Sequence, residues 1–293
     1  MTPNIILITG ATAGIGRHAA LTLARRGHTV IATGRREEAL ASLQAESAGL
    51  HLTTLRLDVT DAQSVAQAVA SVHTLTAGHG LDVLINNAGY GQLGAVLDVD
   101  DGQVRAQYET NVFGVLNTVR AFAPAMIRRG SGRILNVSSI GGLFTLPLFG
   151  VYNSTKYAVE SLSDALRREL RPCGVDVVII EPGTINTNFS STAKASVDRS
   201  GSAWFDVYTT AESNYAWAER MAPDPTPISR VMTRAIESRR PRARYTTPWR
   251  DKLAIQVMNL LPTRLADAIA SAFFGLGKVH PQRVAPVLLA EVA

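Results

Sequence analysis

The stretch Thr9-Gly10-Ala11-Thr12-Ala13-Gly14-Ile15-Gly16 decides the fold. It ends the apolar run 5–9 and opens a segment with helical spacing, so it joins a strand to a helix. Glycines let the backbone turn tightly and approach a pyrophosphate, and the free N–H groups at a helix start attract anionic charge. The stretch therefore predicts a dinucleotide-binding turn, with a plain strand–helix connection as the alternative.

Short apolar, β-branched runs alternate with helical patterns over the first two-thirds of the chain. The runs are residues 5–9, 29–33, 52–57, 83–86, 133–137 and 175–180. Helical spacing is clearest at residues 62–75, 104–126 and 158–170. Strands that are apolar almost throughout, each followed by a helix, are typical of a parallel sheet covered on both faces. Right-handed crossovers then predict an α/β, Rossmann-type doubly wound sheet that binds ligands at the carboxyl ends of its strands.

The pattern changes after residue 185. Residues 186–225 are small and polar with scattered aromatics, and a long irregular segment in a compact fold is typical either of an active-site lid or of disorder. A helical pattern at 228–238, a possible strand at 243–246 and an apolar tail follow. We expect a single domain over residues 1–250, in which 186–225 form a substrate-binding lid. Residues 251–293 are expected to form a C-terminal helical extension packed on the same domain.

Composition excludes several classes of protein. The chain has 293 residues, of which 46% are hydrophobic and 18% charged, so disorder, collagen and coiled coil are excluded. The net charge of +5 arises in residues 239–264; the rest of the chain has 22 basic and 23 acidic residues. A neutral body predicts no nucleic-acid partner.

Cysteine and histidine usage indicates no metal site and no internal disulfide. Cys173 is the single cysteine, and the six histidines show no ligand spacing. The N-terminus has no basic segment or cleavage site of a signal peptide, and no stretch reaches the roughly 18 apolar residues of a membrane span. We therefore expect a cytoplasmic protein.

Further motifs follow the glycine-rich turn in a fixed order. They are Asn86-Asn87-Ala88-Gly89, Asn111 within Thr-Asn-Val-Phe-Gly, Ser139 placed 13 positions before Tyr152, Tyr152-Asn-Ser-Thr-Lys156, and Pro182-Gly183 followed by Thr187. Together with the TGxxxGxG turn, these elements resemble the short-chain dehydrogenase/reductase family over residues 1–250. Residues 140–149, residues 165–174 and Glu181-Pro182-Gly183 resemble most the steroid- and retinoid-type, NADP-preferring branch of this family.

The resemblance implies the site residues. The catalytic set would be Asn111, Ser139, Tyr152 and Lys156. The coenzyme would contact Gly10, Thr12, Gly14, Ile15, Gly16, Arg35, Asp58, Asn87, Tyr152, Lys156, Pro182 and Thr187. Asp58 resembles the residue that contacts the adenine amino group, and a turn or N-cap aspartate is the alternative. The resemblance also implies a homodimer or homotetramer built on the helices that carry Asn111 and Tyr152.

The catalytic residues also make chemical sense by themselves. Tyr152 and Lys156 are four positions apart in a helical stretch, so their side chains share one face. A tyrosine with a pKa of about 10 is a poor base at neutral pH, but a lysine ammonium one turn away and an oxidised nicotinamide lower that pKa. Ser139 is placed to hold the substrate oxygen, with Ser138 as the rival hydroxyl. The resemblance gives Asn111 a water-relay role beside Lys156; the alternative is an amide that bonds helix backbone.

Coenzyme preference is encoded after the second apolar run. Gly34 stands where NAD enzymes of this type carry an acid for the ribose 2′-hydroxyl, and Arg35 follows it. Without the carboxylate, a 2′-phosphate is not repelled, and a guanidinium pairs with it. We therefore expect NADP. The alternative is that Arg35 and Arg36 form a solvated helix start. The family has a second common basic position, which is Ala13 here, so Arg35 is the single basic residue that indicates NADP.

The expected reaction interconverts an alcohol and a ketone or aldehyde. Residues 140–149 would edge the pocket and are strongly apolar, which favours a bulky apolar substrate of steroid, retinoid or lipid type. Reduction of small polar hydroxy compounds or of 3-oxoacyl thioesters is the alternative. A non-catalytic NADP-binding sensor is a third hypothesis, from a different class, although such proteins usually lose the tyrosine or the lysine.

The apolar tail has one helical stripe. Its positions are Leu261, Leu265, Ile269, Ala272, Phe273 and Leu276. We expect this stripe to pack on the body of the protein or on a second subunit and to wall off the substrate pocket. The alternative is that the stripe and the basic run 239–252 lie on an anionic membrane surface, which the sequence does not favour.

Overall fold

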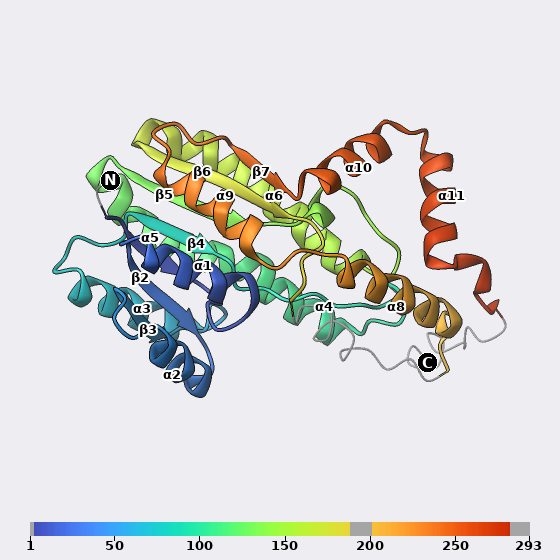
Figure 1. Ribbon diagram of the computed structural model, residues 1–293, viewed down its shortest axis with the longest axis horizontal. Coiled ribbons are helices and arrows are strands. Elements are labelled where there is room, and N and C mark those ends of the chain that lie inside the picture. Colours follow the sequence, from blue (N-terminus) through green and yellow to red (C-terminus); the bar gives the residue numbers. More distant parts are fainter. Residues whose placement is uncertain (1–2, 188–200, 282–293) are drawn as a thin grey trace, which may run out of the picture.

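The computed structural model describes residues 3–187 and 201–281, and a seven-stranded sheet runs through its centre (Figure 1). The strands are β1 (Ile5–Ile8), β2 (Thr29–Gly34), β3 (Leu52–Arg56), β4 (Val83–Asn86), β5 (Gly132–Val137), β6 (Val175–Pro182) and β7 (Arg244–Thr247). All neighbours pair in parallel, in the order β3-β2-β1-β4-β5-β6-β7. The predicted Rossmann-type doubly wound sheet is therefore confirmed.

Helices cover both faces of the sheet, and each face has its own core. On one face lie α1 (Gly14–Arg25), α2 (Glu37–Glu46) and α9 (Thr226–Glu237). On the other lie α3 (Ala62–Leu75), α5 (Gly114–Arg129) and α6 (Gly150–Leu170). Because successive strand residues point to opposite faces, Ile6 and Ile8 enter the first core and Leu7 the second. Each is fully buried, and such burial stabilises the fold by about 1.5–3 kcal/mol per side chain.

The expected helix at 104–126 is one helical segment with an interruption. It consists of α4 (Asp101–Tyr108), the π-helical turn η1 (Glu109–Phe113) and α5. A capping box starts α4, where the carboxylate of Asp100 accepts from the main-chain N–H of Gln103. The wider π turn buries Asn111, and such turns are frequent at functional sites. One additional residue in a turn leaves the apolar spacing nearly unchanged, so the sequence pattern did not reveal it.

The expected irregular lid contains a helix. Within 186–225 the structure has α8 (Phe205–Arg220), while residues 188–200 lie outside the described residues. Tyr208 is buried in α8; its hydroxyl donates to a carboxylate oxygen of Asp98 at 2.7 Å and accepts from the main-chain N–H of Ala95 at 2.7 Å. Tertiary packing stabilises this helix, and the local sequence alone does not encode such contacts.

The C-terminal extension departs from expectation. It begins with α10 (Trp249–Leu260) and continues through α11 (Thr263–Phe274) and the short turn η4 (Leu276–Lys278), and residues 282–293 lie outside the described residues. Phe274 is buried against α8. The expectation that the stripe packs on the body is wrong for Leu265, Ile269 and Phe273, which are nearly half exposed, and its packing on a second subunit stays a prediction. α11 packs on the body through Phe274. Because adjacent helical residues point about 100° apart, Phe273, like Leu265 and Ile269, then faces outward.

Anchoring of the lid generates a stability prediction. Tyr208→Phe removes the hydrogen bonds of the buried hydroxyl to Asp98 and Ala95 and leaves the N–H of Ala95 without this acceptor, whereas Asp98 keeps the hydroxyl of Ser202 as a donor. We therefore expect the free energy of unfolding to fall by about 1–3 kcal/mol in a urea titration. Tyr157→Phe is the matched control, because the Tyr157 ring is 44% exposed on α6; it should change stability by less than about 0.5 kcal/mol. Equal losses in the two variants would contradict the anchoring role.

Candidate active site

The turn between β1 and α1 is shaped for a close anionic ligand. Gly10 and Gly14 have φ angles of +64° and +51°, in the left-handed region that favours glycine. A Cβ at Gly16 would lie 2.5 Å from Nδ2 of Asn87, so this position is closed to larger residues. The first turn of α1 has no side-chain cap, which leaves its N–H groups available to phosphate oxygens. Ile15 lies in the same turn and packs against the first core.

Asn87 ties this turn to the end of β4. Its Nδ2 donates to the main-chain oxygens of Thr9 and Gly10, each at 3.0 Å. The hydroxyl of Thr9 accepts in return from the main-chain N–H groups of Asn87 and Ala88, also at 3.0 Å. The amide of Asn87 therefore fixes the shape of the dinucleotide turn.

The end of β2 lacks room for an acid. A Cβ at Gly34 would lie 2.5 Å from the methyl group of Thr12, so Thr12 fills the space next to Gly34. The guanidinium of Arg35 is exposed, with Nη1 4.0 Å from Oδ2 of Asp58. The other carboxylate oxygen of Asp58 accepts from the main-chain N–H and the hydroxyl of Thr60, at 3.0 and 2.8 Å. Asp58 therefore acts as a turn aspartate, which was the alternative to a contact with the adenine amino group, and it also faces Arg35.

Pro182 ends β6, and the chain then crosses toward α1. The side chain of Thr187 lies 3.6 Å from the position that a Cβ of Gly14 would take, which places it over the dinucleotide turn. The main-chain N–H of Thr184 donates to a carboxylate oxygen of Asp251 in α10 at 2.9 Å. Asp251 holds this segment in place, and no sequence signal pointed to it.

Tyr152, Lys156 and Ser139 converge at the carboxyl end of β5. Nζ of Lys156 donates to the main-chain oxygen of Val137 at 2.9 Å and lies 5.8 Å from the ring centroid of Tyr152. Tyr152 and Ser139 share a side-chain hydrogen bond. Oγ of Ser139 also accepts from the N–H of Gly141 in the short turn η2 (Ile140–Gly142) at 3.0 Å, which orients the hydroxyl.

Burial dominates the electrostatics of this pair. It raises the pKa of Tyr152 to about 12, and the hydrogen bond with Ser139 lowers it in part. It lowers the pKa of Lys156 to about 8, while the negative charge of Glu160 raises it in part. The residues of the protein alone therefore keep Tyr152 protonated at neutral pH; the expected lowering of its pKa involved an oxidised nicotinamide as well as the lysine. A protonated phenol in this place is a proton donor.

Asn111 makes the backbone contacts that the sequence left as an alternative. Its Nδ2 donates to the main-chain oxygen of Tyr90 at 2.9 Å and to the hydroxyl of Thr155 at 3.0 Å, and its Oδ1 accepts from the N–H of Tyr90. A Cβ at Gly89 would lie 3.0 Å from this Oδ1 and 3.8 Å from Nζ of Lys156. Asn111 therefore borders the lysine while its amide secures the loop after β4.

A buried ionic cluster lies behind Lys156, and sequence reasoning missed it. Arg244 of β7 contacts carboxylate oxygens of Glu160, Asp164 and Glu181, each at 3.1 Å. Burial and the neighbouring Glu181 raise the pKa of Glu160, which Ser138 and Arg244 lower in part through hydrogen bonds. Spacing could have found one member, because Glu160 follows Lys156 by one helical turn.

The two serine candidates thus have different surroundings. Ser139 bonds to Tyr152, whereas Ser138 is buried and faces Glu160. A Cβ at Gly142 would lie 2.8 Å from Oγ of Ser138 and 3.0 Å from Cγ of Glu160, which places both on the side of the ionic cluster. The geometry favours Ser139 as the hydroxyl that reaches a substrate.

Apolar side chains from four separate segments surround Tyr152. Its cluster holds Leu93, Ala95, Leu148, Phe149, Val207, Tyr208, Ala211 and Phe274, with Leu146, Trp204 and Tyr215 packed against it. Phe149 contacts Tyr152 edge-on at 6.3 Å between ring centroids and Tyr215 at 5.5 Å. The lid helix α8 and the extension helix α11 therefore build the walls around the reactive hydroxyl.

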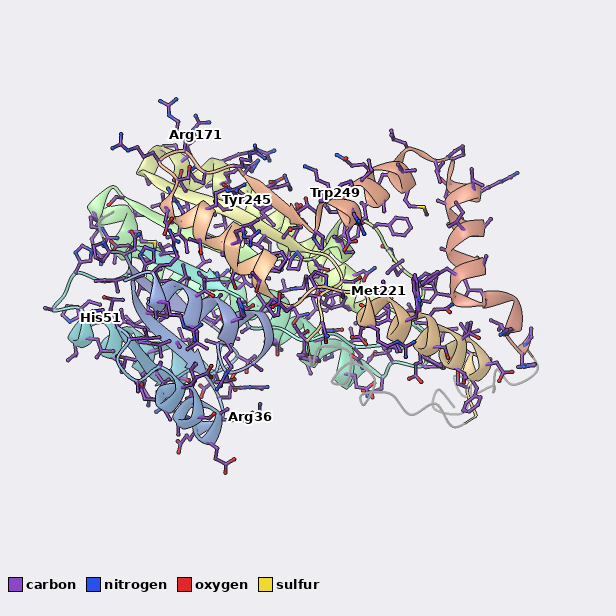
Figure 2. All side chains as sticks on the ribbon, viewed as in Figure 1. Arg36, His51, Arg171, Met221, Tyr245 and Trp249 are labelled. Carbon is purple, nitrogen blue, oxygen red and sulfur yellow. The ribbon has the colours of Figure 1, made fainter. Side chains whose placement is uncertain are left out.

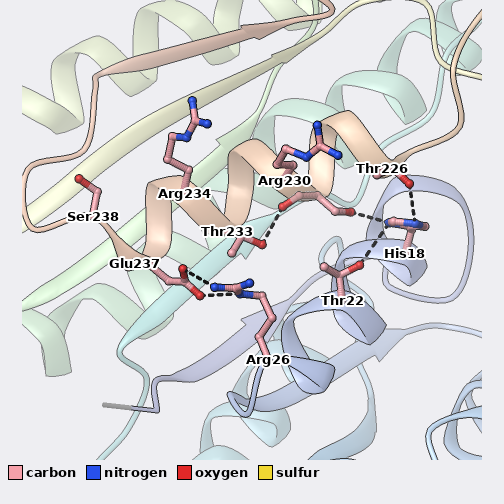
Figure 3. A pocket seen from close by; sticks show the side chains of 10 residues that line it. His18, Thr22, Arg26, Thr226, Arg230, Thr233, Arg234, Glu237 and Ser238 are labelled. Carbon is pink, nitrogen blue, oxygen red and sulfur yellow. Dashed lines mark hydrogen bonds and ion pairs between the residues drawn. The ribbon is translucent and has the colours of Figure 1, made fainter. Parts of the chain in front are cut away.

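A separate groove lies between α1 and α9 (Figure 3). His18 of α1 hydrogen-bonds to the hydroxyl of Ser229 at 2.7 Å, and Arg26 pairs with Glu237 at 2.6 and 2.8 Å. None of the lining residues is among the expected site residues. These contacts join α9 to α1, and the groove has no evident part in the chemistry around Tyr152.

Comparisons with known proteins identify relatives of this chain. The family profile described as short chain dehydrogenase matches residues 4–198. A 3-ketodihydrosphingosine reductase from Bacteroides thetaiotaomicron is 40% identical over 190 residues, 65% of this chain and 67% of the relative. Human 17-beta-hydroxysteroid dehydrogenase type 1 is 35% identical over 289 residues, 93% of this chain and 84% of the relative. An NADPH-dependent 3-dehydrocapnine reductase from Ornithobacterium rhinotracheale is 31% identical over 271 residues, 90% and 94% of the two chains.

Solved structures show the same architecture. A short-chain dehydrogenase/reductase from Burkholderia phymatum in complex with NAD superposes with a TM-score of 0.76 at 27% identity, covering 88% of this chain and 93% of that one. Serine dehydrogenase in its closed form with NADP+ gives a TM-score of 0.71 at 28% identity, covering 83% and 94%. The chain therefore belongs to the short-chain dehydrogenase/reductase family of NAD(P)-dependent oxidoreductases.

Proposed function

We propose that this oxidoreductase uses NADP(H) to interconvert a bulky apolar ketone and its alcohol. The observation that carries the proposal is the apolar cluster around Tyr152, to which residues 140–149, α8 and α11 all contribute. A site lined by apolar side chains with a few convergent polar groups is suited to a substrate of the same character. Relatives that are named for ketodihydrosphingosine and hydroxysteroid substrates support a lipid-like molecule.

The residues of the chain account for proton transfer and orientation. Tyr152 is protonated at neutral pH and donates its proton to the carbonyl oxygen, while Ser139 holds the same oxygen by a second hydrogen bond. The ammonium of Lys156 favours the developing phenolate. Asn111 fixes the loop beside this lysine. A bound nicotinamide supplies or accepts the hydride.

The preference for NADP rests on the end of β2. Gly34 leaves no carboxylate to repel a 2′-phosphate, and Thr12 occupies the space that an acidic side chain would need. The exposed guanidinium of Arg35 is free to turn from Asp58, 4.0 Å away, toward a phosphate. The dinucleotide turn, Asn87 and Thr187 form the remaining cradle.

Assembly and location are also proposals. Phe113 of η1 and Tyr157 of α6 are nearly half exposed, on the two helical segments that carry Asn111 and Tyr152. Such apolar exposure on neighbouring helices supports a homodimer or homotetramer built on them. Among residues 3–187 and 201–281, no helix is long and apolar enough to cross a membrane. We propose a cytoplasmic enzyme.

A ketone panel tests the proposed reaction. With NADPH, the loss of absorbance should give the highest kcat/KM for bulky apolar ketones, because their burial in the cluster around Tyr152 gains about 25 cal/mol for each Å². Small 3-hydroxy or 3-oxo acids and 3-oxoacyl thioesters are the comparison substrates. A preference for either polar group would contradict the proposed substrate class, and no turnover of any substrate would support a coenzyme sensor.

Tyr152→Phe is the matched control for that panel. We expect it to lower kcat on the preferred ketone by about 10²–10⁴-fold, because the proton donor is lost. NADPH affinity, measured by fluorescence titration, should stay near the native value. A variant with native kcat would remove Tyr152 from the mechanism.

Coenzyme discrimination can be measured on Arg35. Arg35→Ala should weaken NADPH binding by roughly 10- to 100-fold, which corresponds to about 1.5–3 kcal/mol for a charge-assisted hydrogen bond, and should leave NADH binding unchanged. Arg36→Ala is the control, since the neighbouring side chain is also exposed to solvent but has no ion pair in the described structure. A native enzyme that binds NADH as tightly as NADPH would refute the preference.

The ionic cluster predicts a pH dependence. Lys156 has a pKa near 8, so kcat/KM for ketone reduction should be constant below about pH 8 and fall above it as the ammonium loses its proton. Glu160→Gln removes a negative charge that raises this pKa, so the fall should move to lower pH. Asp164→Asn changes the same cluster at its more exposed end and should leave the profile unchanged. A profile that is identical in native and Glu160→Gln enzymes would exclude this coupling.

A further inference from the structure

Two exposed apolar stripes lie on the C-terminal helices, which extend beyond β7 at one end of the molecule (Figure 1). The α10 stripe consists of Trp249, Leu253, Val257 and Leu260, with exposed fractions of 68, 52, 50 and 84%. The α11 stripe consists of Leu265, Ile269 and Phe273, with exposed fractions of 49, 44 and 45%. Steps of three or four residues place each stripe on one helical face. Large apolar side chains grouped in this way mark an interaction surface.

Positive charge borders both stripes. Exposed cations on the two helices are Arg250, Lys252 and Arg264. Arg239, Arg240 and Arg242 instead precede β7, at the opposite edge of the sheet, and do not belong to this rim. Of the two acids in α10 and α11, Asp251 already bonds to the N–H of Thr184, and Asp267 remains exposed. Apolar side chains within a basic rim complement a surface that is negatively charged outside and apolar inside.

A lipid surface fits this rim better than a second copy of the chain does. A two-fold contact between identical chains brings the same patch onto itself, so the cations would face one another around the stripes. Anionic headgroups would instead pair with them. Trp249, labelled in Figure 2 at the start of α10, adds the amphipathic ring that is enriched at membrane interfaces, and Arg250 lies 5.9 Å from its ring centroid.

We propose that α10 and α11 dock the protein on an anionic lipid bilayer, with the α10 and α11 stripes entering the headgroup region. The helices lie on the surface and do not span it. The same helices touch the catalytic pocket: Nδ2 of Asn259 donates to the main-chain oxygen of Leu143 at 3.2 Å, and Phe274 packs in the cluster around Tyr152. Docking thus brings the pocket wall to the bilayer, and the uptake of an apolar ketone from it rests on the proposed function.

Vesicle sedimentation tests the docking independently of catalysis. Full-length protein should sediment with vesicles of equal parts phosphatidylcholine and phosphatidylglycerol, and much less with phosphatidylcholine alone. Added salt should weaken the binding, because it screens exposed charges. Sedimentation with neither vesicle would overturn the proposal.

Single charge insertions locate the surface. Leu253→Glu on α10 and Ile269→Glu on α11 should each weaken partition onto the anionic vesicles by about tenfold or more, the factor that burial of one such side chain contributes. Leu75→Glu is the matched control, because Leu75 at the end of α3 is 53% exposed against 52% for Leu253. It should bind as the native protein does. Thermal melting of all three variants shows whether each is folded.

Two further outcomes are decisive. Turnover of a water-soluble ketone should be the same in Leu253→Glu, Leu75→Glu and native protein, so loss of docking is distinguishable from failure of the proposed reaction. Equal weakening by Leu75→Glu and Leu253→Glu would overturn the assignment of the surface. A native dimer that Leu253→Glu converts to monomers, with no vesicle binding by either, would show that a second copy covers these helices.

Discussion

The ammonium group of Lys156 is buried: only 7% of the residue is exposed to solvent. It donates a hydrogen bond to the main-chain oxygen of Val137. Removing a charge from water is costly unless other groups compensate. Val137 ends β5 and Lys156 lies in the second turn of α6, so this bond holds the start of the helix against the carboxyl edge of the sheet. The position of Tyr152, one turn earlier, depends on it.

The remaining compensation comes from charge at a longer range. Glu160, one turn after Lys156, counteracts part of the desolvation that lowers the pKa of the lysine. The carboxylate is itself buried, and Arg244 on the edge strand β7 pairs with it and with Glu181. The last strand of the sheet therefore acts on the active site, because its arginine counteracts part of the burial that raises the pKa of Glu160 beside the lysine.

Local sequence patterns predicted the sheet and the reactive residues, but they did not predict contacts between segments that are distant in the sequence. Apolar runs and a YxxxK spacing are properties of neighbouring positions, so the doubly wound parallel sheet and the convergence of Ser139, Tyr152 and Lys156 could be expected. Asp251, which holds Thr184 across 67 positions, has no local signature. Likewise, the hydrogen bond between Tyr208 and Asp98 stabilises α8. The stripe of α11 faces outward because Phe274 packs against the body. Tertiary packing decides these features.

Gly34 illustrates how packing refines a sequence interpretation. From the sequence it is a missing acid, and restoring aspartate would be the obvious way to convert the coenzyme preference. The structure adds that Thr12, within the dinucleotide turn, reaches to 2.5 Å from where a Cβ would stand. An aspartate at this position must displace Thr12, whose own backbone lies in the phosphate turn, so the substitution would disturb phosphate binding as well as ribose recognition. Coenzyme choice therefore depends on the Gly34–Thr12 contact as well as on Arg35. A substitution of Arg35 alone changes the interaction with the 2′-phosphate and leaves the conformation of the dinucleotide turn unchanged.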